Sequence, residues 1–142
     1  MSISGGLKNH FLNSLIWRGR KITAENFFTS ILLELKSLID LDAFEVFYFS
    51  TLSLRPFVFL RPVKVGSVNY RVPAPISMHK RRLYAVKFIL QAAKDSRGLL
   101  TTTRISSILS DIYLGNKNLA SDKKYNLYLE ATSNVSFIRY LR

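Results

Sequence analysis

The sequence predicts a mainly α-helical protein, a bundle of six helices from which a two-stranded β-hairpin protrudes between the third and fourth helices. Apolar residues recur at helical spacing through most of the chain, whereas residues 57–72 form two short strand-like runs joined by a Gly-Ser pair. A length of 142 residues and an apolar content of 48% are sufficient for one core. We therefore expect a single domain over residues 1–142, with the hairpin as an arm at about 56–73.

The first helix is predicted over Leu7–Arg18, because Leu7, Phe11 and Leu15 recur at helical spacing. Gly19 is a natural C-cap for it. Residues 1–21 contain no acid and so also suit an organellar transit peptide. The helical spacing favours a first core helix over that alternative.

The second helix is expected to begin near Thr23, which can serve as its N-cap. Its wide apolar face consists of Phe27, Phe28, Ile31, Leu32, Leu35 and Leu38. Asp40 or Asp42 can cap a third helix that is apolar nearly all round over residues 43–49, which predicts a central position. Arg55-Pro56 should end this helix.

The hairpin turn is predicted at Gly66-Ser67, since glycine at the first central position supplies the positive φ of a type II′ turn. Side-chain alternation places Lys64 and Arg71 on one face near the tip, and Tyr70 on the other face. Pro62 restricts its strand to an edge. An isolated two-stranded hairpin is marginal in water, so the arm needs a partner on which to lie.

The fourth helix is expected from a cap at Ser77 to about Lys94, and its first turn contains Lys80, Arg81 and Arg82. Cations at a helix N-terminus oppose the macrodipole, whereas a phosphate bound there would gain from them. The predicted buried arc is Leu83, Val86, Ile89, Leu90 and Ala93, bordered by a stripe of Lys80, Lys87 and Lys94. An ordinary solvated helix face is the alternative explanation for these lysines.

The fifth helix is predicted over Thr101–Tyr113, with Ile105, Ile108, Leu109 and Ile112 on its apolar face. Its hydroxyl residues lack a nearby histidine that could act as a base, so capping or solvent exposure explains them better than nucleophilic catalysis. Ser121 or Asp122 can cap a last helix that opens with Lys123-Lys124 and continues to Arg142. Two helices would then begin with cations that oppose the dipole.

The charge is strongly basic and unevenly placed. The chain has 21 Lys and Arg against 9 Asp and Glu, a net charge of +12. Residues 22–54 hold five acids and one base, whereas residues 55–97 hold ten bases and one acid. A polyanionic partner is implied, with nucleic acid ahead of a membrane surface, because no apolar run approaches the length of a spanning helix.

Catalysis is not expected from this sequence. The absence of cysteine and the isolation of His10 and His79 argue against a metal site, and the acids are spaced as scaffold residues. We expect no cofactor, no small-molecule substrate and no membrane partner. The two remaining function classes are a structural RNA-binding protein and, as the alternative, a free DNA- or RNA-binding regulatory protein.

Several motifs in order along the chain resemble small-subunit ribosomal proteins of the S-seven family. The motifs before the hairpin are Gly19-Arg20-Lys21, Thr23-Ala24-Glu25 and Ala43-Phe44-Glu45-Val46. Those in and after it are Arg55-Pro56, Val65-Gly66, Tyr70, Val72-Pro73, Arg81-Arg82, Ala85 and Ala92-Ala93, followed by Lys123-Lys124, Asn134, Phe137 and Tyr140. One departure is Ser67, where the family usually has a second glycine in the turn.

The resemblance implies a six-helix protein that binds the 3′ major domain of small-subunit ribosomal RNA, organises the head of the subunit and lines the exit site for transfer RNA with its hairpin. The implied partners are that RNA, neighbouring head proteins, and transfer RNA and messenger RNA at the exit site. The expected ribosomal RNA-binding residues are Lys8, Arg18, Arg20, Lys21, Arg61, Lys80, Arg81, Arg82, Lys87, Lys123 and Lys124. The expected exit-site residues of the hairpin are Lys64, Gly66, Asn69 and Arg71.

The composition suggests where such a protein would work. Heavy use of Phe, Tyr, Ile, Leu, Asn and Ser is typical of an AT-rich coding genome, which favours a mitochondrial ribosome and an organelle-encoded protein. The coincidence of Leu7–Arg18 with the family's first helix leaves little room for a cleaved presequence. A plastid or bacterial cytoplasm is the alternative location.

Overall fold

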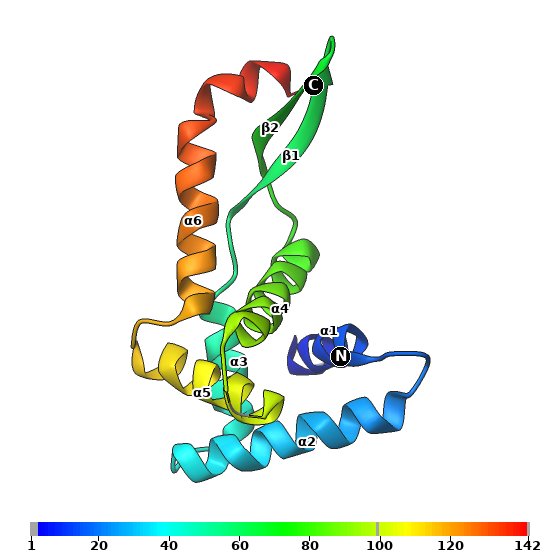
Figure 1. Cartoon of the computed structure of the whole chain (residues 1–142), viewed down its shortest axis with the longest axis vertical. Coiled ribbons are helices and arrows are strands. Elements are labelled where there is room, and N and C mark those ends of the chain that lie inside the picture. The colour runs from blue at the N-terminus through cyan, green and yellow to red at the C-terminus, as the bar shows by residue number, and fades with distance from the viewer. Residues whose placement is uncertain (1–2, 99, 142) are drawn as a thin grey trace.

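The computed structural model describes residues 3–98 and 100–141, and it confirms the mainly helical fold with a hairpin between the third and fourth helices (Figure 1). The elements are α1 (Ile3–Leu15), α2 (Lys21–Leu38), α3 (Ala43–Ser53), β1 (Val58–Val65), β2 (Val68–Pro75), α4 (Met78–Asp95), α5 (Thr101–Leu114), α6 (Leu119–Ser133) and the 3₁₀ helix η1 (Val135–Tyr140). Helices α1 to α5 form the body, whereas α6, η1 and the hairpin extend from it together. Within the described residues no helix is long and apolar enough to cross a membrane.

The core of the body is built around three phenylalanines. Phe47 of α3 is fully buried and meets Phe11 of α1 and Phe28 of α2 edge to face, with ring centroids 5.2 Å apart in both pairs. The predicted central position of α3 is correct for this face only, because Phe49 on its other side remains 48% exposed beside Tyr113. Helix α5 adds its predicted apolar face of Ile105, Ile108, Leu109 and Ile112 to the same core.

The ends of the first two helices differ from the prediction. Helix α1 ends at Leu15, before Arg18, and α2 begins at Lys21 rather than after a cap at Thr23. Both Arg18 and Gly19 have positive φ, 52° and 72°, which turns the chain between the helices. Asp42 is the predicted cap of α3, since its side chain accepts a hydrogen bond from the backbone N–H of Phe44.

The buried face of α4 is rotated from the predicted arc. Leu83 is 39% exposed, whereas Ala85 and Ala92 are fully buried. The helix packs against α1, α3, α5 and α6, so it is surrounded on several sides. Small alanine side chains permit close approach of these neighbours, and a periodicity argument based on large apolar residues overlooks them.

A buried polar contact joins α2 and α5. Ser106 is fully buried, and its hydroxyl donates to the Glu34 carboxylate at 2.8 Å, as does the hydroxyl of Thr102 at the same distance. The expectation of capping or solvent exposure is therefore wrong for Ser106. The hydroxyls satisfy an acid at a helix contact, because a partly buried carboxylate requires donors.

The hairpin has the predicted turn and register. Val65 pairs with Val68 across Gly66 and Ser67, and Gly66 has a φ of 64°, as a type II′ turn requires. Strand β2 nevertheless continues through Pro73 to Pro75, beyond the predicted end of the arm. Counting from the turn, Pro62, Pro73 and Pro75 all fall in non-hydrogen-bonded pairs of the ladder, where a missing N–H costs no bond.

The partner on which the arm lies is the C-terminal part of the same chain. Helix α6 begins at Leu119, capped by the Asn118 side chain, and ends at Ser133, so the predicted cap at Ser121 or Asp122 and the continuous last helix are wrong. The hydroxyls of Thr132 and Ser133 bond back to carbonyls of the preceding turn, which favours a helix end there. The predicted end at Arg142 lies outside the described residues.

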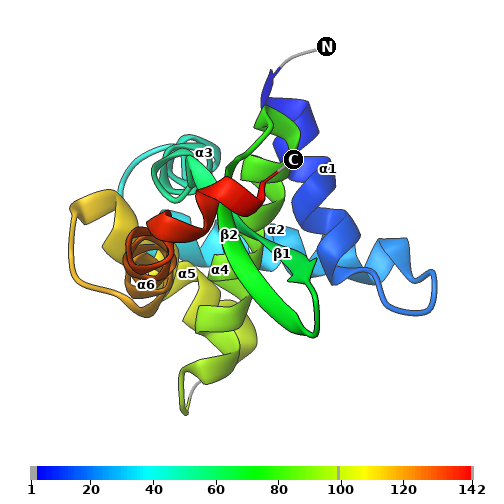
Figure 2. The same ribbon diagram turned by 90° about the horizontal axis from the view of Figure 1, so that it is seen from above.

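The 3₁₀ helix η1 then covers the hairpin. Tyr70 of β2 stacks on Tyr140 at 5.0 Å between ring centroids and contacts Phe137 at 4.8 Å. On the other face of the hairpin, Arg71 forms an ion pair with Glu130 of α6. The view from above shows η1 crossing from α6 to the strands (Figure 2). Only the tip, residues 64–69, is exposed throughout.

Candidate nucleic-acid interface

The N-terminal end of α4 lies beneath the hairpin, and two of its cations contact phenylalanine rings around the start of β1. The Lys80 ammonium lies 5.3 Å from the centroid of the Phe59 ring, and the Arg81 guanidinium lies 4.9 Å from that of Phe57. Ser77 is the N-cap residue, but its side chain makes no capping hydrogen bond. The first backbone N–H groups of α4 are therefore left without that side-chain acceptor, and cations surround them.

Arg82 points from α4 toward α1. A Cβ placed on Gly6 would come within 3.2 Å of Nη1 of Arg82, so glycine permits this approach. The sequence treats His10 and His79 as isolated, yet the structure brings their rings together at 4.6 Å between centroids. The segment after α3 brings Arg55 close to Arg82 in the same region.

Among the described residues no acid forms an ion pair with Arg55, Arg81 or Arg82. Burial first, and then the charge of Arg82, lower the pKa of Arg55, whereas neighbouring Tyr48 partly offsets the effect. Nε and Nη2 of Arg55, together with Nε of Arg81 and of Arg82, are buried and have no hydrogen-bond partner within the described part of the chain. A buried guanidinium nitrogen without an acceptor is costly, and a phosphate bound beside these arginines would supply acceptors for their guanidinium groups. We call Arg55, Arg81 and Arg82 the α4 cationic cluster, and His10 and His79 lie against it.

His10, which lies against the α4 cationic cluster, makes stability depend on pH. Burial, followed by the charges of His79 and Arg82, lowers the pKa of His10 below its ordinary value of 6.5. His10 therefore has a lower pKa in the folded protein than in the unfolded chain, where the ordinary value applies. Between the two values the unfolded chain binds the proton more readily, so the free energy of unfolding decreases as the pH falls below about 6.5. Urea denaturation at pH 7.5 and about 5.5 should show this loss, and His10→Asn should reduce it. An equal pH dependence in the His10→Asn variant would contradict the assignment.

The loop between α1 and α2 carries a second group of cations. Arg18, Arg20 and Lys21 are exposed, and Lys21 makes only a long, exposed i,i+4 contact of 3.9 Å with Glu25. Lys8, also exposed, lies on α1 with its ammonium 6.0 Å from the Phe28 ring centroid. Exposed contacts of this kind contribute little to stability, so these cations remain available to a polyanion.

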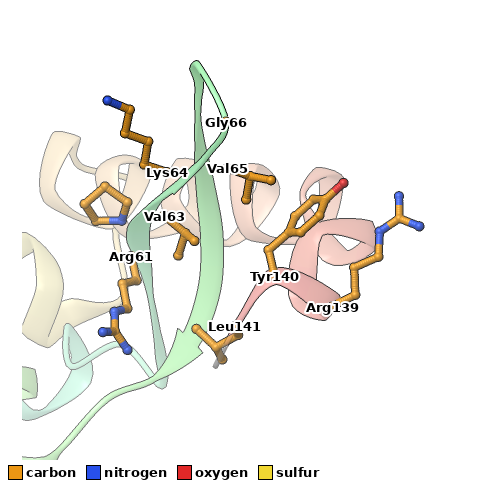
Figure 3. A pocket seen from close by; sticks show the side chains of 9 residues that line it. Arg61, Val63, Lys64, Val65, Gly66, Arg139, Tyr140 and Leu141 are labelled. Carbon is orange, nitrogen blue, oxygen red and sulfur yellow. The ribbon is translucent and has the colours of Figure 1, made fainter.

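The exposed tip of the hairpin presents Lys64 and Asn69 as a directly opposed pair. Arg71 was expected to act with them, but its ion pair with Glu130 directs it to α6. A pocket of about 720 Å³ separates this strand from the C-terminal segment (Figure 3). In the close-up Val65 and Tyr140 face one another, whereas the charged ends of Lys64 and Arg139 point in opposite directions. The pocket therefore does not gather its cations around one anion.

Lys123 and Lys124 occupy a different place from the one expected. Because α6 begins at Leu119, they lie in its second turn and do not oppose the dipole at its first N–H groups. Lys123 forms an ion pair with Asp95, at the opposite end of α4 from Arg81 and Arg82. Lys124 donates to the backbone carbonyl of Ser53 at 2.7 Å, and burial lowers its pKa. Both lysines thus make intramolecular contacts that stabilise the position of α6.

Lys87 of α4 and Arg61 of β1 are exposed. Sequence reasoning did not assign four residues to this site: Gly6, His10, Arg55 and His79. No local pattern marks them as site residues, and only the packing of α1, α3 and α4 brings them together. Within residues 3–98 and 100–141 no three His, Asp or Glu side chains are grouped as metal ligands would be.

Comparison with known proteins agrees with this architecture. A family model described as ribosomal protein S7p/S5e matches residues 4–134. The small ribosomal subunit protein uS7m of Reclinomonas americana is 28% identical over 130 residues, which are 92% of this chain and 81% of the relative. The uS7 protein of Borrelia garinii subsp. bavariensis is 30% identical over 131 residues, 92% of this chain and 83% of the relative.

The uS7 protein of Blochmanniella pennsylvanica is likewise 30% identical, over 130 residues that make up 92% of this chain and 83% of the relative. The family model covers the helices of the body, the hairpin and α6. The chain therefore belongs to the ribosomal protein S7p/S5e family.

Proposed function

We propose that this chain is a structural protein of the small ribosomal subunit that binds the 3′ major domain of the ribosomal RNA and organises the subunit head. Family membership supports the ribosomal role. The observation that carries RNA binding is the α4 cationic cluster, whose buried guanidinium nitrogens have no acceptor among the described residues. A protein that kept such a cluster only for folding would gain from a neighbouring carboxylate.

The body and the arm have different tasks in this proposal. The α4 cationic cluster and the α1–α2 loop, with Lys8, Lys80 and Lys87 beside them, form the primary ribosomal RNA site. Lys123 and Lys124 contribute from a separate position, because their intramolecular contacts must be exchanged or shared. The tip of the hairpin reaches the exit site for transfer RNA, near messenger RNA, and exposed Phe57 adjoins neighbouring head proteins.

The ribosome in question is proposed to be mitochondrial. A mitochondrial uS7m is among the relatives, and the amino-acid usage suits an AT-rich organelle genome. Bacterial relatives of equal or higher identity keep a bacterial or plastid ribosome as the alternative. Fractionation of source cells, followed by detection of the chain in mitochondrial or cytosolic ribosomes, separates these locations.

Sedimentation of native lysate through a sucrose gradient tests the proposed function. The chain should travel with small subunits, and ultraviolet crosslinking followed by sequencing should recover 3′-domain nucleotides attached near Arg82. Recovery of the chain only in free fractions, or crosslinked to DNA, would favour the regulatory alternative instead.

The hairpin tip can be removed without disturbing its base. Replacing residues 64–69 by Asn-Gly keeps the Val63–Tyr70 pair and closes it with a two-residue turn. Tyr70 and Arg71 must stay, because their contacts with Tyr140 and Glu130 hold the arm to the C-terminal segment. We expect normal folding, and a salt slope of RNA binding lower by about one unit for the lost Lys64 contact.

Translation by subunits that contain the shortened protein should suffer more than their assembly. Gradient profiles measure assembly, and peptide synthesis with retention of exit-site transfer RNA measures function. Tyr70→Ala is the matched control, because it leaves the tip in the sequence and removes its support. If the shortened protein fails to bind RNA or to enter subunits, the arm belongs to the primary site and the division of tasks is wrong.

A further inference from the structure

Trp17 is the single tryptophan of the chain, and the fold does not use it in the core. Its side chain is 64% exposed in the segment between α1 and α2. The guanidinium carbon of Arg18 lies 4.2 Å from the centroid of the indole ring, so a cation already stacks on the ring. A large aromatic side chain held in solvent offers a face on which another ring can stack.

The backbone presents Trp17 in a defined turn. The N–H of Arg20 donates to the carbonyl of Trp17 at 3.2 Å, and the N–H of Lys21 donates to that of Gly19 at 2.9 Å. The positive φ of 52° at Arg18, unusual for a residue other than glycine, belongs to the same turn. The indole therefore projects from a hydrogen-bonded turn rather than from an extended linker.

A small apolar pocket of about 250 Å³ adjoins the indole. It is lined by Leu15, Trp17, Arg20, Thr23, Ala24 and Phe27. The lining contains an arginine and no acid, and exposed Arg18 and Lys21 flank it in the sequence. Its volume lies below the range of roughly 300–1,000 Å³ that is usual for drug-sized ligands, so one ring system fits better than an extended molecule.

We propose that Trp17 and this pocket hold an unpaired base of the bound RNA, with Arg18, Arg20 and Lys21 contacting the phosphates on either side of that base. The inference deepens the RNA-binding role proposed above and rests on it. Exposed aromatic rings interleaved with cations are the usual platform for single-stranded nucleic acid, because every base has a face that can stack. The excess of positive charge around the pocket, from Arg18, Arg20 and Lys21 against Glu25, favours a base, which brings phosphates with it, over an apolar side chain of a protein neighbour.

Intrinsic fluorescence tests the proposal, because all tryptophan emission of the full chain comes from Trp17. The protein is titrated with a transcript of the 3′ domain of its ribosomal RNA, while filter retention measures binding independently. We expect strong quenching of Trp17 that follows the retention curve. Binding without quenching would overturn this proposal alone, whereas no binding in the retention assay would overturn the proposed function itself.

Two variants distinguish stacking from charge. Trp17→Leu removes the aromatic face and is expected to lower RNA affinity about 5- to 100-fold at every salt concentration, with the salt slope unchanged. Trp17→Phe keeps a smaller face and should recover part of this loss. Lys21→Ala is the matched control, because loss of a phosphate contact lowers the slope by about one unit.

Three other results would overturn the proposal. Unchanged affinity in Trp17→Leu would exclude a stacked base. A lower salt slope in that variant would show that Trp17 acts only by holding Arg18. Shielding of Trp17 from acrylamide in assembled subunits, but not in the protein–RNA complex, would assign the pocket to a neighbouring protein. Circular dichroism of each variant establishes that the fold is retained.

Discussion

Raising the salt concentration from 50 to 200 mM is expected to weaken binding of this protein to its ribosomal RNA by about 10³- to 10⁵-fold. The physical reason is release of condensed counterions when about 6–10 phosphates are neutralised by lysine and arginine. The structure supplies exposed cations on α1, the α1–α2 loop, α4 and the hairpin, and no acid pairs closely with most of them. Affinities measured over a salt series give the number of contacts directly as the slope.

The charge on the protein alone would not guarantee this result. Net charge attracts any polyanion, whereas a linear log–log plot with a steep slope requires specific phosphate contacts. An unrelated transcript of equal length should bind more weakly and serves as the control. A nearly flat plot for the 3′ domain would contradict the electrostatic interpretation of the surface.

Replacing Arg81 and Arg82 together by alanine is expected to lower RNA affinity by about 100-fold or more, because hydrogen bonds to charged groups contribute about 1.5–3 kcal/mol each. The free energy of unfolding should stay the same or rise slightly. Arg81 lies in the first turn and opposes the dipole of α4, and Arg82, at the start of the second turn, brings a like charge close to Arg55. Filter retention measures the affinity, and urea denaturation measures the stability.

Arg104 offers the matched control, since it is an arginine with a structural task. Its Nη1 donates to the carbonyls of Ala93 and Ser96 at 2.9 and 2.8 Å, and its Nη2 donates to Thr101 at 3.1 Å. Arg104→Ala should therefore destabilise the protein by about 1–3 kcal/mol and leave the RNA affinity of the folded fraction unchanged. If the double variant lost stability instead, Arg81 and Arg82 would be structural residues like Arg104.

The helices of the body were predictable because their apolar residues recur every three or four positions. The buried set of α5 matches the prediction at all four isoleucine and leucine positions. The turn at Gly66 was equally predictable, because the positive φ that it requires is a local property of the two central residues. The family resemblance, which the comparisons confirm, rests on the same short motifs in order.

Helix ends were harder to predict from the sequence, because competing capping residues lie within a few residues of one another. Thr23 and Ser121 are good capping residues by type, yet α2 begins before the first and α6 begins before the second. The Asn118 side chain accepts the bond that caps α6, and that choice moves Lys123 and Lys124 out of the first turn. An electrostatic argument from sequence therefore depended on a boundary that sequence does not fix well.

The sequence by itself determined the helical bundle, the hairpin, the basic half of the chain and the cations at the start of α4, because each depends on residues close together in the chain. Only the tertiary structure decided which cations act together. It brings His10 to His79 and Arg55 to Arg82, and it turns η1 back to place Tyr140 on Tyr70. These contacts join residues far apart in the sequence, and the packing of helices and strands against one another, which no local pattern records, sets their geometry.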